Sequence, residues 1–302
     1  MTQVPVPPDF LKDRPLIDAA TRLAGIIGWP VDHSQSPRVH GFWLAKFGIN
    51  GAYVPLPVPP EEIEAALHGL LALGFRGANV TIPHKETVMA LLDHVTPLAR
   101  QIGAVNTLFV RSDGRLEGTN TDAQGFIDNL HATVPDWKAD AAPAVVLGAG
   151  GASRAVCAAL LTAGVPRLTI LNRTPERARC LADTLAEYHA AEIRVLSLSE
   201  TAWHRAAGEA GLAVNTTSLG MKGHPPLGFA MTELPPSAVV ADTVYAPLRT
   251  PFIAAAEQCG LRTVDGLGML LYQAGPGFTR WFGKKPQVTD ELRAFVLAGM
   301  KG

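Results

Sequence analysis

The sequence has few cysteines, no marked excess of either charge and no long hydrophobic run. Three cysteines occur among its 302 residues, at positions 157, 180 and 259, and no two of them form a C-x-x-C pair. This spacing suggests neither a disulfide framework nor a zinc site. The cysteines are therefore expected to be buried, small apolar residues of a protein from a reducing compartment, the cytoplasm, with no bound metal.

The charge balance excludes two classes of partner. The net charge is −1 and 18% of the residues are charged, so no basic surface for nucleic acid or anionic lipid is predicted. No apolar run approaches the roughly 18 residues that a membrane span needs. Residues 1–21 contain Pro5, Pro7 and Pro8 but neither a basic start nor an apolar core. We expect them to form a loose arm or a short helical lead-in, and no signal peptide.

The most informative stretch lies in the middle of the chain. Residues 143–147 form a short apolar run of strand length, and the glycines at 148, 150 and 151 precede a helix of small residues. Strand, glycine turn and helix together are typical of a dinucleotide site, where the pyrophosphate lies at the positive end of the helix. Ser153 stands at the sixth position of the G-x-G-x-x-G/A pattern. Alone the match is weak, since glycine-rich turns occur in many folds.

The next predicted strand indicates which dinucleotide binds. Residues 167–171 run into Asn172, Arg173 and Thr174, about 20 residues past the glycines, where an NAD site carries an acidic residue. A carboxylate there would repel a 2′-phosphate, whereas a guanidinium, an amide and a hydroxyl suit one. The site therefore favours NADP.

Strands and helices alternate along most of the chain, which predicts an α/β fold with a mostly parallel sheet. Polar residues follow the carboxyl ends of the predicted strands, where ligands gather in such sheets. Ser36 is predicted to cap a helix that starts at Pro37, and His84–Glu86 to open a helix that runs through Leu92.

Taken in order, the motifs resemble the shikimate dehydrogenase family from about residue 25 to residue 281. Residues 28–37 resemble its substrate loop, residues 79–85 its catalytic-lysine motif, and residues 103–107 and 120–122 the stretches that supply a substrate-binding Asn and the catalytic Asp. Residues 148–154 and 172–174 resemble its NADP site, and residues 215–221, 242–245, 250–252 and 266–273 resemble its remaining signatures near the nicotinamide and substrate. Gly41 departs from the family pattern, which often has Asn or Gln there, and the arm before residue 22 carries no signature.

The resemblance implies a set of site residues. Lys85 and Asp122 are the expected catalytic pair. The expected substrate contacts are Ser34, Ser36, Asn79, Thr81, Lys85, Asn106, Asp122, Tyr245 and Gln273. The expected cofactor contacts are Gly148, Ala149, Gly150, Gly151, Ala152, Asn172, Arg173, Thr174, Thr217, Ser218, Val244, Gly266 and Met269.

Elementary chemistry agrees with these roles. Hydride transfer to a ketone leaves an alkoxide that needs a proton in place. A helix start at Lys85 would disfavour its ammonium form, and an ionised Asp122 would hold and orient that ammonium. His84 is a rival acid, and Lys85 could instead be an ordinary solvated lysine. No Tyr-x-x-x-Lys motif occurs, which argues against a short-chain dehydrogenase. The absence of a zinc-ligand pattern excludes a zinc alcohol dehydrogenase, and the absence of G-x-x-x-x-G-K-[ST] excludes a nucleotide-triphosphate loop.

The resulting prediction is a two-domain enzyme. A substrate domain of residues 1–122, completed by 265–302, is expected to flank a Rossmann NADP-binding domain of residues 123–264, with the active site in the cleft between them. The implied reaction is the reversible NADPH-dependent reduction of 3-dehydroshikimate to shikimate, a step of the chorismate pathway to aromatic amino acids. A quinate or aminoshikimate dehydrogenase and a non-catalytic NADP or shikimate sensor remain alternatives, as do a monomer and a homodimer.

Overall fold

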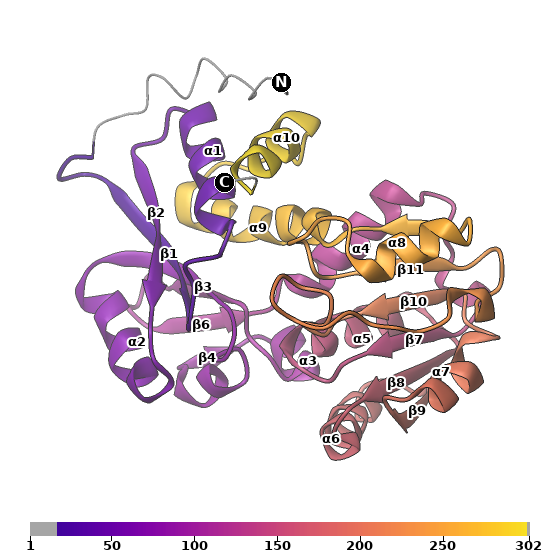
Figure 1. The fold of residues 1–302 in the computed structure, drawn as a ribbon. Coiled ribbons are helices and arrows are strands. Elements are labelled where there is room, and N and C mark those ends of the chain that lie inside the picture. The colour runs from indigo at the N-terminus through magenta and orange to yellow at the C-terminus, as the bar shows by residue number, and fades with distance from the viewer. Residues whose placement is uncertain (1–16, 301–302) are drawn as a thin grey trace. The chain divides into compact units, whose positions relative to one another are not determined.

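A computed structural model describes residues 17–300, which divide into two compact units (Figure 1). The first unit comprises the described residues through Arg100, Ala104–Thr121 and the chain from Gln273 onward. The second comprises Gln101–Gly103 and Asp122–Tyr272. Most of the arm predicted before residue 22 lies outside the described residues. Within residues 17–300, no helix is long and apolar enough to cross a membrane.

The first unit contains a six-stranded mixed sheet, as described over residues 17–300. Its order is β2-β1-β3-β5-β6-β4, in which β5 runs antiparallel to both of its neighbours and the other pairs are parallel. The strands are β1 (Arg22–Gly28), β2 (Gly51–Pro57), β3 (Phe75–Val80), β4 (His94–Val95), β5 (Thr107–Val110) and β6 (Leu116–Thr119).

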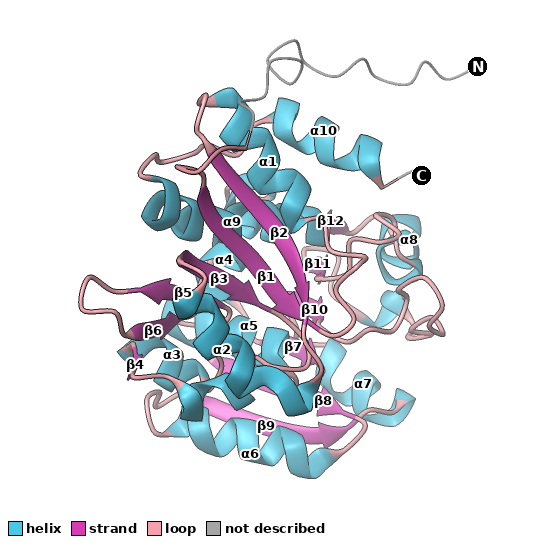
Figure 2. Ribbon diagram, turned by 90° about the vertical axis from the view of Figure 1, so that its left-hand side faces the viewer, coloured by secondary structure: helices cyan, strands magenta, loops and turns pink. Residues whose placement is uncertain are grey.

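Helices pack on the sheet of the first unit, as Figure 2 shows. The core under α2 joins Leu67 and Leu70 of that helix to Ile27 of β1 and Leu108 of β5. The late helix α9 is tied to the same sheet, because the indole nitrogen of Trp281 donates to the Leu108 carbonyl at 3.0 Å. The helices are α1 (Ser36–Lys46), α2 (Ile63–Ala72), α10 (Asp290–Gly299), the part of α3 (Pro97–Ile102) through Arg100 and the part of α9 (Gly266–Phe282) from Gln273 onward.

The second unit is built on a fully parallel sheet of six strands within the described residues, in the order β12-β11-β10-β7-β8-β9. All residues of β7, β10 and β11 are buried, as expected of central strands covered on both faces. The strands are β7 (Ala144–Leu147), β8 (Arg167–Asn172), β9 (Glu192–Ser197), β10 (Leu212–Asn215), β11 (Val239–Asp242) and β12 (Arg262–Val264). The helices are α4 (Asp122–Thr133), α5 (Gly151–Ala163), α6 (Pro175–Ala186), α7 (Glu200–Ala207) and α8 (Pro251–Gln258).

The α/β class with mostly parallel sheets is confirmed, but local predictions failed at three places. Residues 82–86 form turns and Thr87–Leu91 a 3₁₀ helix, so no α-helix starts at Lys85 and no helix dipole acts there. Ser36 is the first residue of α1, whose N-cap is Gln35. Of the cysteines only Cys157 is buried, and burial raises its pKa to about 12, while Cys180 and Cys259 are exposed.

A buried histidine lies at the centre of the aromatic core of the first unit. The His40 ring is fully buried and stacks on Tyr53, with ring centroids 3.9 Å apart, and it also contacts Trp43, Phe278 and Trp281. Among the described residues, neither ring nitrogen of His40 has a hydrogen-bond partner. Burial lowers the pKa of His40 to about 3, which keeps the ring neutral.

This histidine should couple folding to pH. The unfolded chain binds the His40 proton with an ordinary pKa near 6.5, whereas the folded chain binds it only near 3. Below pH 6.5 the unfolded state therefore takes up the extra proton, and the free energy of unfolding should fall by up to about 1.4 kcal/mol per pH unit. Urea unfolding of His40→Phe between pH 7 and pH 5 should lack this contribution. A His33→Phe control, at an exposed position, should keep the parental slope, and the same slope in both variants would contradict the prediction.

Candidate functional site

The first unit gathers buried amide and hydroxyl side chains at the start of β5. Oδ1 of Asn106 accepts hydrogen bonds from Thr121 N at 2.8 Å and from Thr107 Oγ1 at 2.9 Å. Its Nδ2 donates to Thr121 Oγ1 at 3.1 Å and to Gln273 Oε1 at 3.3 Å. Residues distant in sequence thus meet in one network, in which the buried Gln273 is bonded to Asn106. We call Asn79, Asn106, Thr107, Thr121 and Gln273 the amide cluster.

Asn79 is held more tightly than the sequence suggests. Its Nδ2 donates to Asn106 O at 3.1 Å and to Thr107 Oγ1 at 3.0 Å, so both amide hydrogens are used. Its Oδ1 accepts the hydroxyl of Tyr53 at 2.6 Å. Only one Oδ1 lone pair is left for any ligand. Sequence reasoning missed Tyr53, because nothing in the β2 pattern shows which polar atom lies across the sheet.

Backbone hydrogen bonds fix the segment that carries Lys85. Thr81 N donates to Ile27 O at 2.8 Å, and Val105 N donates to Lys85 O at 2.8 Å. The half-buried lysine therefore lies on a turn anchored one residue before Asn106. His84, the rival acid, is buried, and its Nε2 lies 2.7 Å from Val58 O, to which it must donate because a carbonyl only accepts. This contact gives His84 a structural role.

The remaining substrate candidates divide between the two units. Ser34 and Ser36 belong to the first, and Ser36 N donates to Ser34 Oγ at 3.3 Å, which brings the two serines together at the start of α1. Asp122 and Tyr245 belong to the second unit. Asp122 is buried at the first position of α4, directly after Thr121 of the amide cluster. Tyr245 is half-buried in the loop after β11.

The glycine turn after β7 has the form expected of an anion site. Gly148 has φ +117°, and a Cβ there would lie 2.6 Å from Thr216 Oγ1, so only glycine fits. Gly150 precedes α5, and a Cβ at Gly150 would meet no protein atom within 4 Å. Ser153, the departure at the sixth position, is fully buried and donates to Gly148 O at 2.7 Å, which closes the turn.

The end of β8 supplies the expected polar trio. Asn172 is the last residue of β8, and its Nδ2 donates to Thr174 O at 2.8 Å, which organises the turn into α6. Arg173 and Thr174 are exposed. Arg177, in the first turn of α6, adds a second exposed cation that sequence reasoning did not single out.

Three further segments of the second unit carry the other cofactor candidates. Thr217 is hydrogen-bonded through its backbone N and its Oγ1 to Asn215 Oδ1, at 3.0 and 2.8 Å, and the exposed Ser218 follows it. Gly266 opens α9 against the loop after β11, since a Cβ there would lie 2.4 Å from Thr243 O. Val244 and Met269 are buried.

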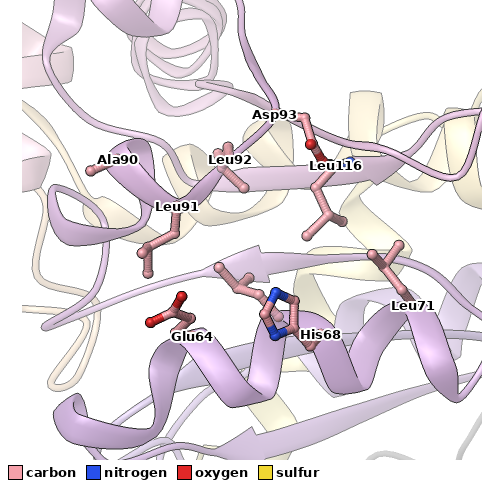
Figure 3. Close-up of a pocket in the computed structure, with 9 residues that line it drawn as sticks. Glu64, His68, Leu71, Ala90, Leu91, Leu92, Asp93 and Leu116 are labelled. Atoms are coloured by element: carbon pink, nitrogen blue, oxygen red, sulfur yellow. Dashed lines mark hydrogen bonds between the residues drawn. The ribbon is translucent and has the colours of Figure 1, made fainter.

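A separate hollow of about 300 Å³ in the first unit holds none of the predicted residues (Figure 3). Figure 3 shows Glu64 and His68 of α2 on one side and Leu91, Leu92 and Asp93 on the other. Its lining combines five leucines and Ala90 with Glu64, His68 and Asp93. Within residues 17–300, no group of three or more His, Cys, Asp or Glu side chains could hold a metal ion.

Comparison with known proteins identifies the family. The shikimate dehydrogenase substrate-binding domain profile matches residues 26–108, and the shikimate/quinate 5-dehydrogenase profile matches residues 131–209. A Rhodospirillum rubrum protein named shikimate dehydrogenase (NADP(+)) is 58% identical over 93% of this chain and 99% of its own length. The chain belongs to the shikimate dehydrogenase family.

Solved structures of shikimate dehydrogenase family members agree. The shikimate 5-dehydrogenase of Thermus thermophilus, in complex with NADP(H) and shikimate, is 36% identical, with a TM-score of 0.79 over 93% of this chain and 99% of that chain. A quinate dehydrogenase from Corynebacterium glutamicum, in complex with NAD, is 32% identical, with a TM-score of 0.83 over 92% and 99%. The resemblance inferred from the sequence is therefore confirmed.

The hydrogen bond from Tyr53 to Asn79 can be tested by deleting one oxygen. Tyr53→Phe leaves the buried Oδ1 of Asn79 without this donor, and an unsatisfied buried polar atom costs about 1–3 kcal/mol. We expect the free energy of urea unfolding to fall by about that amount. Tyr188→Phe, at an exposed tyrosine, should change it by less than about 0.5 kcal/mol. Equal effects in the two variants would argue against the hydrogen bond.

Proposed function

We propose that this protein catalyses the reversible NADPH-dependent reduction of 3-dehydroshikimate to shikimate, in the route to chorismate and the aromatic amino acids. The observation that carries the proposal is the near full-length match at 58% identity to a protein named shikimate dehydrogenase (NADP(+)). The retained Lys85 and Asp122 support catalysis over a sensor role, since a binding protein has no chemical need of both.

The second unit fits NADP at two points. Gly150 leaves space for a pyrophosphate against the start of α5, where backbone N–H groups and the helix dipole favour an anion. Arg173, Asn172 and Thr174 end β8 with a cation, an amide and a hydroxyl and no carboxylate, which suits a 2′-phosphate. We propose that Thr217, Ser218, Val244, Gly266 and Met269 hold the rest of the cofactor. When bound, NADPH supplies the hydride.

The first unit supplies the proton in this proposal. The Lys85 ammonium donates a proton to the substrate oxygen as the ketone becomes an alcohol, and it regains one in the reverse direction. Asp122 is proposed to hold and orient that ammonium. The backbone bond from Val105 to Lys85 O keeps the lysine beside the amide cluster.

The substrate contacts follow from the hydrogen-bonding capacity of each side chain. Ser34 and Ser36, joined by the hydrogen bond from Ser36 N to Ser34 Oγ, are proposed to bind the substrate carboxylate, and Tyr245 is a further contact. Gln273 and Thr81 are proposed to bind substrate hydroxyls, and Asn106 to do so by exchanging one of the hydrogen bonds that its amide hydrogens make to Thr121 and Gln273. Asn79 has both amide hydrogens committed within the protein, so we propose that it contributes mainly by holding Asn106 and Thr107 in place. A cytoplasmic location and a monomeric or homodimeric state remain predictions.

The first test is a cross of substrates and cofactors. Absorbance of the reduced nicotinamide is followed with shikimate or quinate against NADP⁺ or NAD⁺, for the parent and for Lys85→Ala. We expect turnover with shikimate and NADP⁺, and a loss of about 10²–10⁴-fold in kcat for Lys85→Ala, because the group that accepts the hydroxyl proton of shikimate is removed. Lys284→Ala, at an exposed lysine, is the control and should retain the parental kcat.

Each other outcome selects an alternative. Preference for quinate would replace the substrate assignment, and the quinate dehydrogenase among the structural relatives makes that arm necessary. Preference for NAD⁺ would replace the cofactor assignment. Binding of NADP⁺ without turnover in any combination would favour the sensor.

The open space at Gly150 yields a second test. Gly150→Ala keeps a backbone that alanine adopts readily, at φ −98°, and its methyl group meets no protein atom within 4 Å. The methyl would instead occupy space proposed for the pyrophosphate. We expect the Kd for NADP⁺ to rise about tenfold or more, equivalent to about 1.4 kcal/mol. The free energy of unfolding should stay the same or rise slightly.

Gly208→Ala is the matched control for this test. Gly208 follows α7 in the same unit with φ −60°, and a Cβ there also meets no atom within 4 Å. It should leave the Kd for NADP⁺ unchanged. Unaltered NADP⁺ binding in Gly150→Ala would remove the glycine turn from the proposed cofactor site.

A further inference from the structure

Asp242 is a buried carboxylate to which the proposed reaction gives no role. It is the last residue of β11, is 2% exposed, and pairs in register with Asn215 at the end of β10. Burial raises its pKa to about 6, against the opposing effect of its hydrogen bonds from Thr250, Val244 and Asn215. At pH 8 it is therefore a buried anion.

Three neutral donors from three segments bind this anion. Its Oδ1 accepts Asn215 Nδ2 at 3.0 Å, from the end of β10, and Val244 N at 2.9 Å, from the loop after β11. Its Oδ2 accepts Thr250 Oγ1 at 2.7 Å, from the N-cap of α8. We call Asp242, Asn215, Val244 and Thr250 the Asp242 junction.

Two of the three residues that bind Asp242 lead to proposed ligand contacts. Oδ1 of Asn215 accepts two hydrogen bonds from Thr217, and its Nδ2 also donates to Leu219 O at 3.1 Å, so the amide shapes the loop that carries Thr217 and the following serine. Val244 is itself a proposed cofactor contact, and Tyr245 is the next residue.

The choice of a carboxylate here is informative. Burying a charge without a cationic partner is costly, and an apolar side chain would serve stability alone at least as well. A carboxylate, however, accepts several charge-assisted hydrogen bonds in fixed directions. Asp242 therefore fixes the end of β10, the loop after β11 and the start of α8 relative to one another. Among the hydrogen bonds described, no other side chain accepts from all three of these segments.

We propose that Asp242 is a positioning residue for the cofactor. By binding Asn215, Val244 and Thr250 together, it holds the loop of Thr217 and the loop of Val244 in the arrangement that receives NADP(H). The inference rests on the proposed function, because it takes these two loops to be cofactor contacts.

The test separates positioning from general destabilisation. The Kd for NADPH is measured by fluorescence titration of the substrate-free protein at pH 8, for the parent, Asp242→Ala, Asp242→Asn and Thr169→Val. Asn can accept from Asn215 and Val244 through its oxygen and can donate to Thr250 Oγ1. Thr169→Val alters another buried polar residue of the same sheet, on β8, away from the strand ends.

We expect Asp242→Ala to raise the Kd for NADPH about tenfold or more, and Asp242→Asn and Thr169→Val to stay within about threefold of the parent. A parental Kd in a folded Asp242→Ala protein would overturn the inference.

If Asp242→Ala does not fold, the Kd values of Thr250→Val and Thr250→Ser test the inference instead. A higher Kd in the valine variant alone supports positioning, and an equal Kd in both overturns it. A parent that does not bind NADPH refutes the proposed function itself, and this inference with it.

Discussion

The requirement that a buried amide satisfy all its hydrogen bonds organises both units of this protein. In the first unit Asn106, just before β5, binds Thr107, Thr121 and Gln273, and so draws together segments from β5, the end of β6 and α9. In the second unit Asn215, at the end of β10, binds Thr217 and Asp242 in the same manner. In each case one amide at a strand end fixes the loops that carry the proposed contacts.

This arrangement explains why Asn79, Asn106 and Gln273 are buried in the first unit rather than displayed on flexible loops. An amide with its donors and acceptors already used is expensive to move, because each broken bond leaves an unsatisfied polar atom. Asn79 shows the consequence, since Tyr53, Thr107 and the Asn106 backbone occupy nearly all of its capacity. The proposed ligand contacts of the first unit are thereby preorganised.

Sequence reasoning succeeded where structure is decided locally. The glycines predicted the turn from β7 to α5. The polar residues at the end of β8 were predicted from the apolar run before them and from their distance of about 20 residues from those glycines. It failed where residues far apart in the sequence determine the local structure. The predicted helix at Lys85 gives way to turns because Lys85 O binds Val105, beyond the helical range of sequence separation, and Pro83 precedes it. Strands as short as β4 and β12 carry too few residues to show a period.

The same distinction applies within the site. The family motifs locate Lys85, Asn106 and Gln273, but they do not show which of their atoms the protein already uses. Asp242 illustrates the limit, because its sequence context is an apolar strand end and its partner Thr250 is eight residues away. Only the fold shows that one carboxylate joins three segments. A motif thus identifies the residues of a site, whereas the division between groups that bind a ligand and groups that hold those binders is decided by three-dimensional hydrogen bonding.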